Sequence, residues 1–534
     1  MSTNFRIPWR SSVVAFCLLA GSLLLAAPAP APAATSPSGG AMPKGFLWGT
    51  AIAGFQSEMG RGQDLDVNSD WWQWVHDPGN ISSKVTSGDL PENGPGFWSQ
   101  YASDVKLARK GLGANLFRLG LEWSRLFPHA PTGLPEGAAD ASPAMLHALD
   151  AQADQGAVRH YRKILSAIRA QKMSPFVTLN HFTLPAWIDD PIAVREAFKG
   201  RRPNADLPAL QKAGWLDDQI VPQFGRYAAW AAWRFGDLVD RWAPINEPMV
   251  VATNGYVNIP GAISGNFPPG VYSFTAATAA IQNLEAANTV AYDVIKTLDP
   301  TSKVGLVQNM IAFTPSNPSK AADVKASAHA DYLFNRLFVN AAVKGNIDRN
   351  ADGVLQPTER GVHGPRADFL GVNYYFRGRA QGLGFAFTPK IPVLDFLPRT
   401  GYRWELAPKA APCPTLCSDF GSEIYPAGLR QVLKTAGSYD LPVIVTENGI
   451  ADSSDRLRPK FLRDHLRQIR ASIKAKEANV VGWIGWSLTD NFEWVSGYRP
   501  KFGLYSFNPQ TLKRTARKKS VELLHRAASA NRAP

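Results

Sequence analysis

Residues 442–450 read PVIVTENGI, an almost continuously apolar run that ends in the polar pair Glu447 and Asn448. Runs of this kind, rich in Val, Ile and Leu, are typical of strands that a parallel sheet buries on both faces. Seven similar runs occur elsewhere, namely GFLWGTAIA (45–53), ANLFRLGLEW (114–123), SPFVTLNHF (174–182), DRWAPINEP (240–248), SKVGLVQNM (302–310), DFLGVNYYF (368–376) and VVGWIGWSL (480–488). The sequence therefore predicts eight strands.

Helical stretches separate most of these runs. Residues 157–172 and 462–477, for example, carry apolar side chains at helical spacing. Eight strand–helix repeats favour a closed barrel over an open sheet, and barrels of this length are commonly one domain. We predict an α/β fold, a (β/α)8 TIM barrel, in a single domain over residues 45–534.

The predicted strands end in polar side chains. A TIM barrel carries its active site at the carboxyl ends of its strands, and a barrel without a site there would have no reason to collect amides and carboxylates. The pattern therefore indicates an enzyme. The strand-end residues are Asn180 and His181, Asn246 and Glu247, Asn373, Glu447 and Asn448, and Asp490 and Asn491.

Two of these residues, Glu247 and Glu447, suit glycoside hydrolysis. They end the fourth and seventh predicted strands, whose side chains can meet over the barrel mouth. Retaining glycosidases need two carboxyl groups about 5–5.5 Å apart, so that one can attack carbon while the other handles the proton. Either glutamate alone would be weak evidence for a glycosidase, but the two together at these strand ends are strong evidence.

The N-terminus is typical of an export signal. Arg6 and Arg10 precede an apolar run over 13–27, and small residues that suit cleavage follow. We predict a signal peptide over 1–34, a linker over 35–44, and a secreted or periplasmic protein. Membrane association after export is left open. Cys413 and Cys417 are the cysteines beyond the signal, and the spacing allows either a disulfide or free thiols.

The formal net charge of +13 does not indicate a nucleic-acid partner. The densest basic run, residues 513–519, has no interleaved aromatic residues and belongs to no recognised binding motif. We interpret this run as the solvated face of a C-terminal helix.

Long segments of the chain resemble glycoside hydrolase family 1, and within it the archaeal-type β-glycosidases. The resemblance implies that Glu447 is the nucleophile and Glu247 the acid/base, and that catalysis needs no cofactor. It implies β-D-glucosides, galactosides or fucosides as small-molecule or oligosaccharide substrates. The matching segments are FLWGTAIAGFQSEMG, NSDWWQWVHDP, SGDLPENGPGFW, FRLGLEWSRLFP, NEP, GVNYY, VTENGIAD and WSLTDNFEWVSGYRPKFGL.

The resemblance also implies a set of substrate-binding residues. From the residues alone, Arg118 could instead make a structural ion pair, and His181 could be a core histidine. Two positions depart from the family pattern, because Phe182 and Ser422 stand where tryptophan is usual. The substrate-binding residues implied are Gln56, Arg118, His181, Asn246, Asn373, Tyr375, Trp486, Glu493 and Trp494.

Two other functions compete with hydrolysis. A transglycosylase that transfers the sugar to an alcohol or lipid would use the same residues, and a non-catalytic sugar-binding protein would have lost one glutamate. A 6-phosphoglycosidase is rejected, because Glu493 would repel the phosphate. We expect broad specificity among glucosides, galactosides and fucosides, with the aromatic loop 383–404 against the aglycone.

Residues 348–359 read DRNADGVLQPTE and fit the calcium loop D-x-[DN]-x-[DN]-G-x5-E. Gly353 occupies the sixth position, where the turn is sharp. The alternative is a polar surface loop that fits by chance. We predict a structural Ca²⁺ that raises thermal stability, with ligands from Asp348, Asn350, Asp352, Val354, Gln356 and Glu359.

Overall fold

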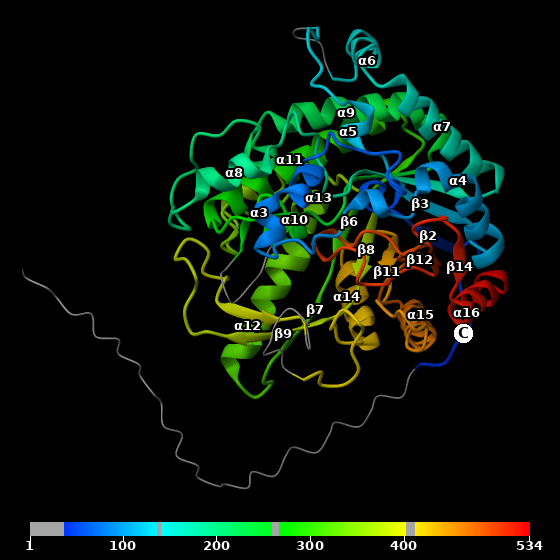
Figure 1. The fold of residues 1–534 in the computed structure, drawn as a ribbon. Coiled ribbons are helices and arrows are strands. Elements are labelled where there is room, and N and C mark those ends of the chain that lie inside the picture. The colour runs from blue at the N-terminus through cyan, green and yellow to red at the C-terminus, as the bar shows by residue number, and fades with distance from the viewer. Residues whose placement is uncertain (1–36, 136–139, 259–265, 402–411) are drawn as a thin grey trace, which may run out of the picture. The chain divides into compact units, whose positions relative to one another are not determined.

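The computed structural model describes residues 37–534 apart from 136–139, 259–265 and 402–411 (Figure 1). The predicted signal peptide over 1–34 lies outside these residues. No helix in the described part of the chain is both long and apolar enough to cross a membrane.

Eight parallel strands form a closed barrel, as predicted, and each lies within one of the eight apolar runs. The strands are buried over almost their whole length, because helices cover the outer face and side chains fill the interior. In spatial order they are β11 (Val443–Asn448), β12 (Val480–Gly485), β2 (Leu47–Ala51), β3 (Leu116–Gly120), β4 (Ser174–Asn180), β5 (Arg241–Ile245), β6 (Lys303–Asn309) and β8 (Phe369–Tyr374).

Amphipathic helices surround the barrel (Figure 1). The helix Gln155–Ala170 shows why they form: Asp154 caps it by accepting from the Ala157 amide at 2.9 Å, and Val158, Tyr161, Ile164, Leu165 and Ile168 are buried on one face. The main outer helices are α4 (Phe97–Lys106), α7 (Gln155–Ala170), α9 (Ile220–Phe235), α11 (Phe274–Leu298), α13 (Leu337–Lys344), α14 (Pro426–Gly437), α15 (Arg458–Lys474) and α16 (Lys518–Ser529).

A small sheet outside the barrel was not predicted. It consists of β10 (Phe396–Arg399), β9 (Arg377–Gly382) and β7 (Ala312–Pro315), in that order, and packs against α12 (Ala321–Ala330). One of its strands, β10, lies within the aromatic loop predicted over 383–404. Near it, Cys413 and Cys417 form a disulfide.

The folded unit begins earlier than the predicted boundary at Gly45. The strand β1 (Gly40–Ala41) pairs with β15 (Arg532–Ala533), and Met42 is buried. Asn531 donates to the Met42 and Pro43 carbonyls and accepts from the Trp48 indole. Residues 40–42 of the predicted linker over 35–44 therefore belong to the folded unit, because backbone pairing with the C-terminus orders a segment that has no apolar pattern of its own.

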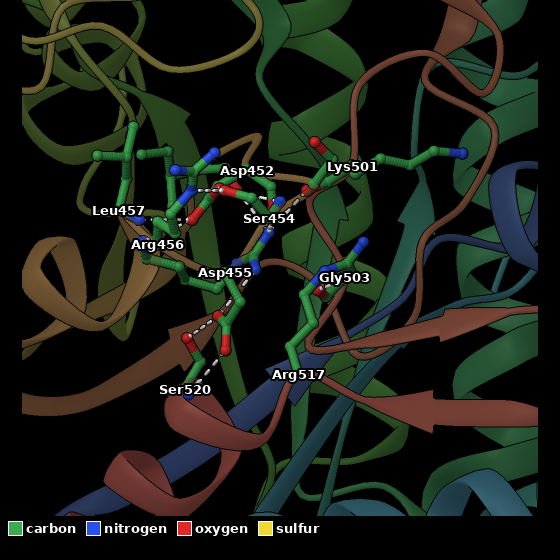
Figure 2. Close-up of polar contacts among 12 residues, drawn as sticks. Asp452, Ser454, Asp455, Arg456, Leu457, Lys501, Gly503, Arg517 and Ser520 are labelled. Carbon is green, nitrogen blue, oxygen red and sulfur yellow. Dashed lines mark hydrogen bonds and ion pairs between the residues drawn. The ribbon is translucent and has the colours of Figure 1, made fainter.

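A buried polar network holds the loop that follows β11. Asp452 accepts from the backbone amides of Leu457 and Arg458, both at 2.8 Å, and the Arg458 guanidinium donates to the carbonyls of Asp452 and Lys501 at 2.7 Å. Figure 2 shows Asp455 of this loop facing Ser520 of α16, which donates to it at 2.5 Å. The network thus connects the loop that follows Glu447 in the sequence to the C-terminal helix α16.

Candidate active site

Glu447 lies at the carboxyl end of β11, and both of its carboxylate oxygens are engaged. Arg118 from β3 donates to Oε1 and the Tyr375 hydroxyl donates to Oε2, each at 2.5 Å. The glutamate and the arginine are both buried. A carboxylate held between a guanidinium and a phenol is fixed in direction.

Glu247 follows β5 and caps α10 (Pro248–Tyr256) with a left-handed backbone, at φ 50°. Its Oε1 accepts from the amides of Asn373 at 2.6 Å and Asn309 at 3.0 Å. Burial, and then the charge of Glu447, raises the pKa of Glu247 from 4.5 to about 8. This carboxyl group therefore holds its proton at neutral pH.

A polar net joins the two glutamates. The Asn246 side-chain oxygen accepts from Arg118 at 2.7 Å and from Asn373 at 3.2 Å, and its amide nitrogen lies 3.4 Å from His181 Nε2. Burial, and then the charge of Arg118, lowers the pKa of His181 well below its usual range. The histidine is thus neutral and can both donate and accept hydrogen bonds.

Four further predicted residues gather at one side of the glutamates. Gln56 on α1 (Gly54–Ser57) donates to the Phe492 carbonyl at 2.9 Å, while its own side-chain oxygen is buried and has no partner in the described part of the chain. Trp486 donates to Glu493 at 3.3 Å, and Trp494 stacks on His181. Unfilled acceptors and flat aromatic faces of this kind suit a pyranose ring and its hydroxyl groups.

The structure brings the predicted residues together around one cavity of about 2210 Å³, lined by His181, Glu247, Tyr375, Glu447, Trp486, Glu493 and Trp494 among others. Phe182 and Ser422, the two departures, also line it. Phe182 packs on Trp494 and Phe267 and offers no polar atom to a sugar. Of the predicted aromatic loop, Leu394 and residues 396–401 line the cavity.

Asn309 is a site residue that the sequence analysis missed. It ends β6 and donates to the Glu247 carboxylate, yet its run, SKVGLVQNM, was used only to place a strand. Its position at a barrel strand end, shared with Asn180 and Asn373, was the available signal.

The predicted calcium ligands make hydrogen bonds within their own loop. Asp352 accepts from the Val354 amide at 2.7 Å, and Glu359 accepts from the backbone amides of Arg349 and Gln356. Within the described ranges, no three Asp, Glu, His or Cys side chains are grouped closely enough to hold a metal ion. The loop is closed by hydrogen bonds of its own.

A buried pair of carboxyl groups at the mouth of a TIM barrel, one bound on both oxygens by an arginine and a tyrosine and the other with a raised pKa, defines the class of two-carboxylate glycoside hydrolases. The model of glycosyl hydrolase family 1 matches residues 38–193 and 205–532. The chain belongs to this family. Its chemistry is that of a retaining β-glycosidase and requires no cofactor.

Relatives in sequence and structure agree with this assignment. The chain is 37% identical over 516 residues to a β-galactosidase of Pyrococcus woesei, covering 92% of this chain and 97% of that protein. It is similar to the crystal structure of the β-glycosidase from Thermosphaera aggregans, with a TM-score of 0.79 and 34% identity over 92% of this chain and 97% of that one. These relatives favour hydrolysis, and none of them favours a transglycosylase or a non-catalytic sugar-binding protein.

Proposed function

We propose that the protein hydrolyses β-linked glycosides by double displacement, with Glu447 as nucleophile and Glu247 as acid/base. The observation that supports this assignment is that the two carboxyl groups have different surroundings. Arg118 and Tyr375 bind both oxygens of Glu447, while Glu247 is buried and carries a raised pKa. A nucleophile must be ionised, and an acid must hold a proton.

In the first step, Glu447 attacks the anomeric carbon as Glu247 protonates the leaving oxygen, and a glycosyl-enzyme forms. The negative charge on Glu447 is lost when the covalent bond forms, so the pKa of Glu247 falls and the carboxylate can accept a proton from water in the second step. Asn246 is expected to bind the sugar 2-hydroxyl, a contact that strengthens as positive charge develops on the ring.

Two substitutions test these roles. Glu447→Gln should abolish turnover, because the amide cannot form the ester intermediate. Glu247→Ala should slow substrates with poor leaving groups far more than activated aryl glycosides, because only the former need a proton. Glu522→Gln, an exposed change on α16, is the control. NMR showing that the first-formed sugar has the inverted anomeric configuration would refute the double displacement.

We propose broad specificity for β-D-glucosides, galactosides and fucosides. The 36%-identical relative from Saccharolobus solfataricus is named a β-galactosidase, and a similar structure from Pyrococcus furiosus is named a β-glucosidase. Gln56 and Glu493 offer both donor and acceptor atoms, which suits either orientation of a sugar 4-hydroxyl. Comparing kcat/KM for matched aryl glycosides tests this, and a preference above about a thousandfold for one epimer would contradict it.

We also propose that the protein is exported, on the sequence of residues 1–34. Residues 13–27 are apolar, follow two arginines and precede small residues, as in cleaved signal peptides. N-terminal sequencing of the protein recovered outside the cytoplasm should give a new end within the small-residue segment. Recovery of the intact N-terminus in the cytoplasm would overturn export.

We propose further that the loop 348–359 binds a structural calcium ion, together with Glu285 of α11. Glu285 is buried, and neither of its carboxylate oxygens has a partner among the residues that the structure describes. Burial, and then the charge of Asp348, raises the pKa of Glu285 well above its usual range. Gln282, one turn earlier on α11, donates to the Arg349 carbonyl at 2.7 Å and so joins the helix to the loop. A cation would satisfy both unpartnered oxygens.

Melting curves and calorimetry with CaCl₂ test this site. Millimolar calcium should raise the melting temperature of the native protein. Glu285→Gln should raise the melting temperature measured without calcium, because it removes a buried acid. Calcium should not raise the melting temperature of this variant further. Glu522→Gln serves as the control. If calorimetry shows no heat of calcium binding and calcium leaves the melting temperature unchanged, the calcium site is refuted and the motif fits by chance.

A further inference from the structure

Two arginines stand directly opposite each other on neighbouring strands of the small sheet. In the antiparallel pairing of β9 and β10, Arg399 is the partner of Arg379, and Leu397 is the partner of Gln381. Because side chains alternate along a strand, these four residues share one face of the pair. The other face carries Ala380 and Phe396, which are buried in a small apolar cluster.

Neither arginine has an anionic partner in the described part of the chain. Among the described residues, the Arg379 and Arg399 side chains make no ion pair or hydrogen bond, and the Arg379 Nε atom is buried without an acceptor. Arg377, two residues earlier on the same face, shows the contrast: Glu423 binds it with both carboxylate oxygens, at 3.0 and 2.5 Å. Like charges directly opposite on adjacent strands repel each other, so the uncompensated pair costs stability.

Both arginines line the same cavity as Glu247 and Glu447. The acidic side chains that line the cavity do not neutralise them. Glu493 pairs with Trp486 at the glycone side, and Asp419 accepts from the backbone and hydroxyl of Ser453. A cavity of about 2210 Å³ holds much more than one sugar ring, so a substrate can extend from the glutamates toward the sheet.

We infer that Arg379 and Arg399 form a binding site for an anionic group on the aglycone, so that the substrates include β-glycosides of carboxylate- or phosphate-bearing alcohols. This inference rests on the proposed hydrolase function and specifies its substrate class. Two guanidinium groups on one face can bind a carboxylate or phosphate in a bidentate manner. Gln381 on the same face adds an amide donor, and the apolar Leu397 suits an alkyl or aryl linker.

The test is a series of ω-carboxyalkyl β-D-glucosides with spacers of increasing length, each compared with its methyl ester. The ratio of kcat/KM for the acid to that for the ester should exceed one at the spacer length that reaches the sheet, and should fall with added salt. The double variant Arg379→Gln/Arg399→Gln should lower this ratio about tenfold, the effect of one or two charge-assisted hydrogen bonds. Hydrolysis of the esters should fall less than hydrolysis of the acids.

Arg159→Gln is the matched control, because Arg159 is exposed on α7, on the outside of the barrel. An acid-to-ester ratio that is the same in the native enzyme and the double variant at every spacer length would overturn the inference. Inorganic phosphate could instead inhibit hydrolysis of the acids and the esters equally, while the enzyme shows no preference for the acids. This result would mean that the arginines bind a free anion, and it would also overturn the inference. Failure of the enzyme to hydrolyse even the esters would refute the proposed function instead.

Discussion

Removing the charge of Glu447 should release the proton of Glu247 at lower pH. Two carboxylates about 5 Å apart, as retaining chemistry requires, interact by about 3 kcal/mol at an effective dielectric constant of ~20. In Glu447→Gln the acid dissociation constant of Glu247 should therefore rise about a hundredfold. The pKa should stay above 4.5, because burial is the larger cause of the raised value.

NMR of protein labelled at the glutamate side-chain carboxyl carbons measures this change. The Glu247 signal is identified by its loss in Glu247→Gln, and Glu522→Gln shows the effect of an unrelated exposed change. In the native enzyme, kcat/KM for a glycoside with a poor leaving group should fall as pH rises through about 8, since the protonated acid is then lost. If Glu247 titrates at the same pH with and without the Glu447 charge, burial alone holds the proton, and the paired-carboxylate reasoning is wrong.

Three further perturbations have defined outcomes. Asn309→Ala removes a hydrogen bond that lowers the Glu247 pKa, so the alkaline limb of the kcat/KM profile should move to higher pH; a shift to lower pH would contradict the assignment. Asp452→Ala leaves the backbone amides behind β11 unpaired and should lower the free energy of unfolding by about 2–4 kcal/mol in urea titrations, whereas the exposed Glu522→Ala should not. Burial raises the pKa of Glu122 from 4.5 to about 8. The folded state thus holds this proton more tightly than the unfolded one, and the resulting stabilisation is complete below pH 4.5 and lost as pH rises through 8. Melting should accordingly occur at lower temperature at pH 8.5 than at pH 6, and Glu122→Gln should reduce that difference.

The barrel and its two glutamates could be predicted because their signals are local. Each barrel strand is a short apolar run, and each glutamate directly follows one. The small sheet could not be predicted in this way: β9 contains Arg377, Gly378 and Arg379, which have neither the alternation nor the composition of a typical strand. Its formation depends on packing against α12 and on pairing with β7 and β10, contacts between segments far apart in the sequence.

The calcium loop and the linker show two other reasons why structure could not be predicted from local sequence. The motif over 348–359 specifies ligand types, but in the structure the loop's own amides occupy Asp352 and Glu359. Glu285, a buried acid with no hydrogen-bond partner among the described residues, lies on a helix more than 60 positions earlier, where no local pattern relates it to the loop. The order of residues 37–44 likewise depends on the opposite end of the chain.

The pairing of β1 with β15 makes the backbone nearly circular. Pro534 accepts from Arg467 on α15, and Arg470 on the same helix donates to the Ser38 carbonyl, so both ends of the described unit lie against one helix. A short peptide could join Pro534 to Pro37, and new ends could be opened in the exposed segment near Arg201, within the stretch that the family model leaves unmatched. Such a circular permutant should keep the barrel order and both glutamates, and it would carry a fusion partner at a point chosen by the experimenter.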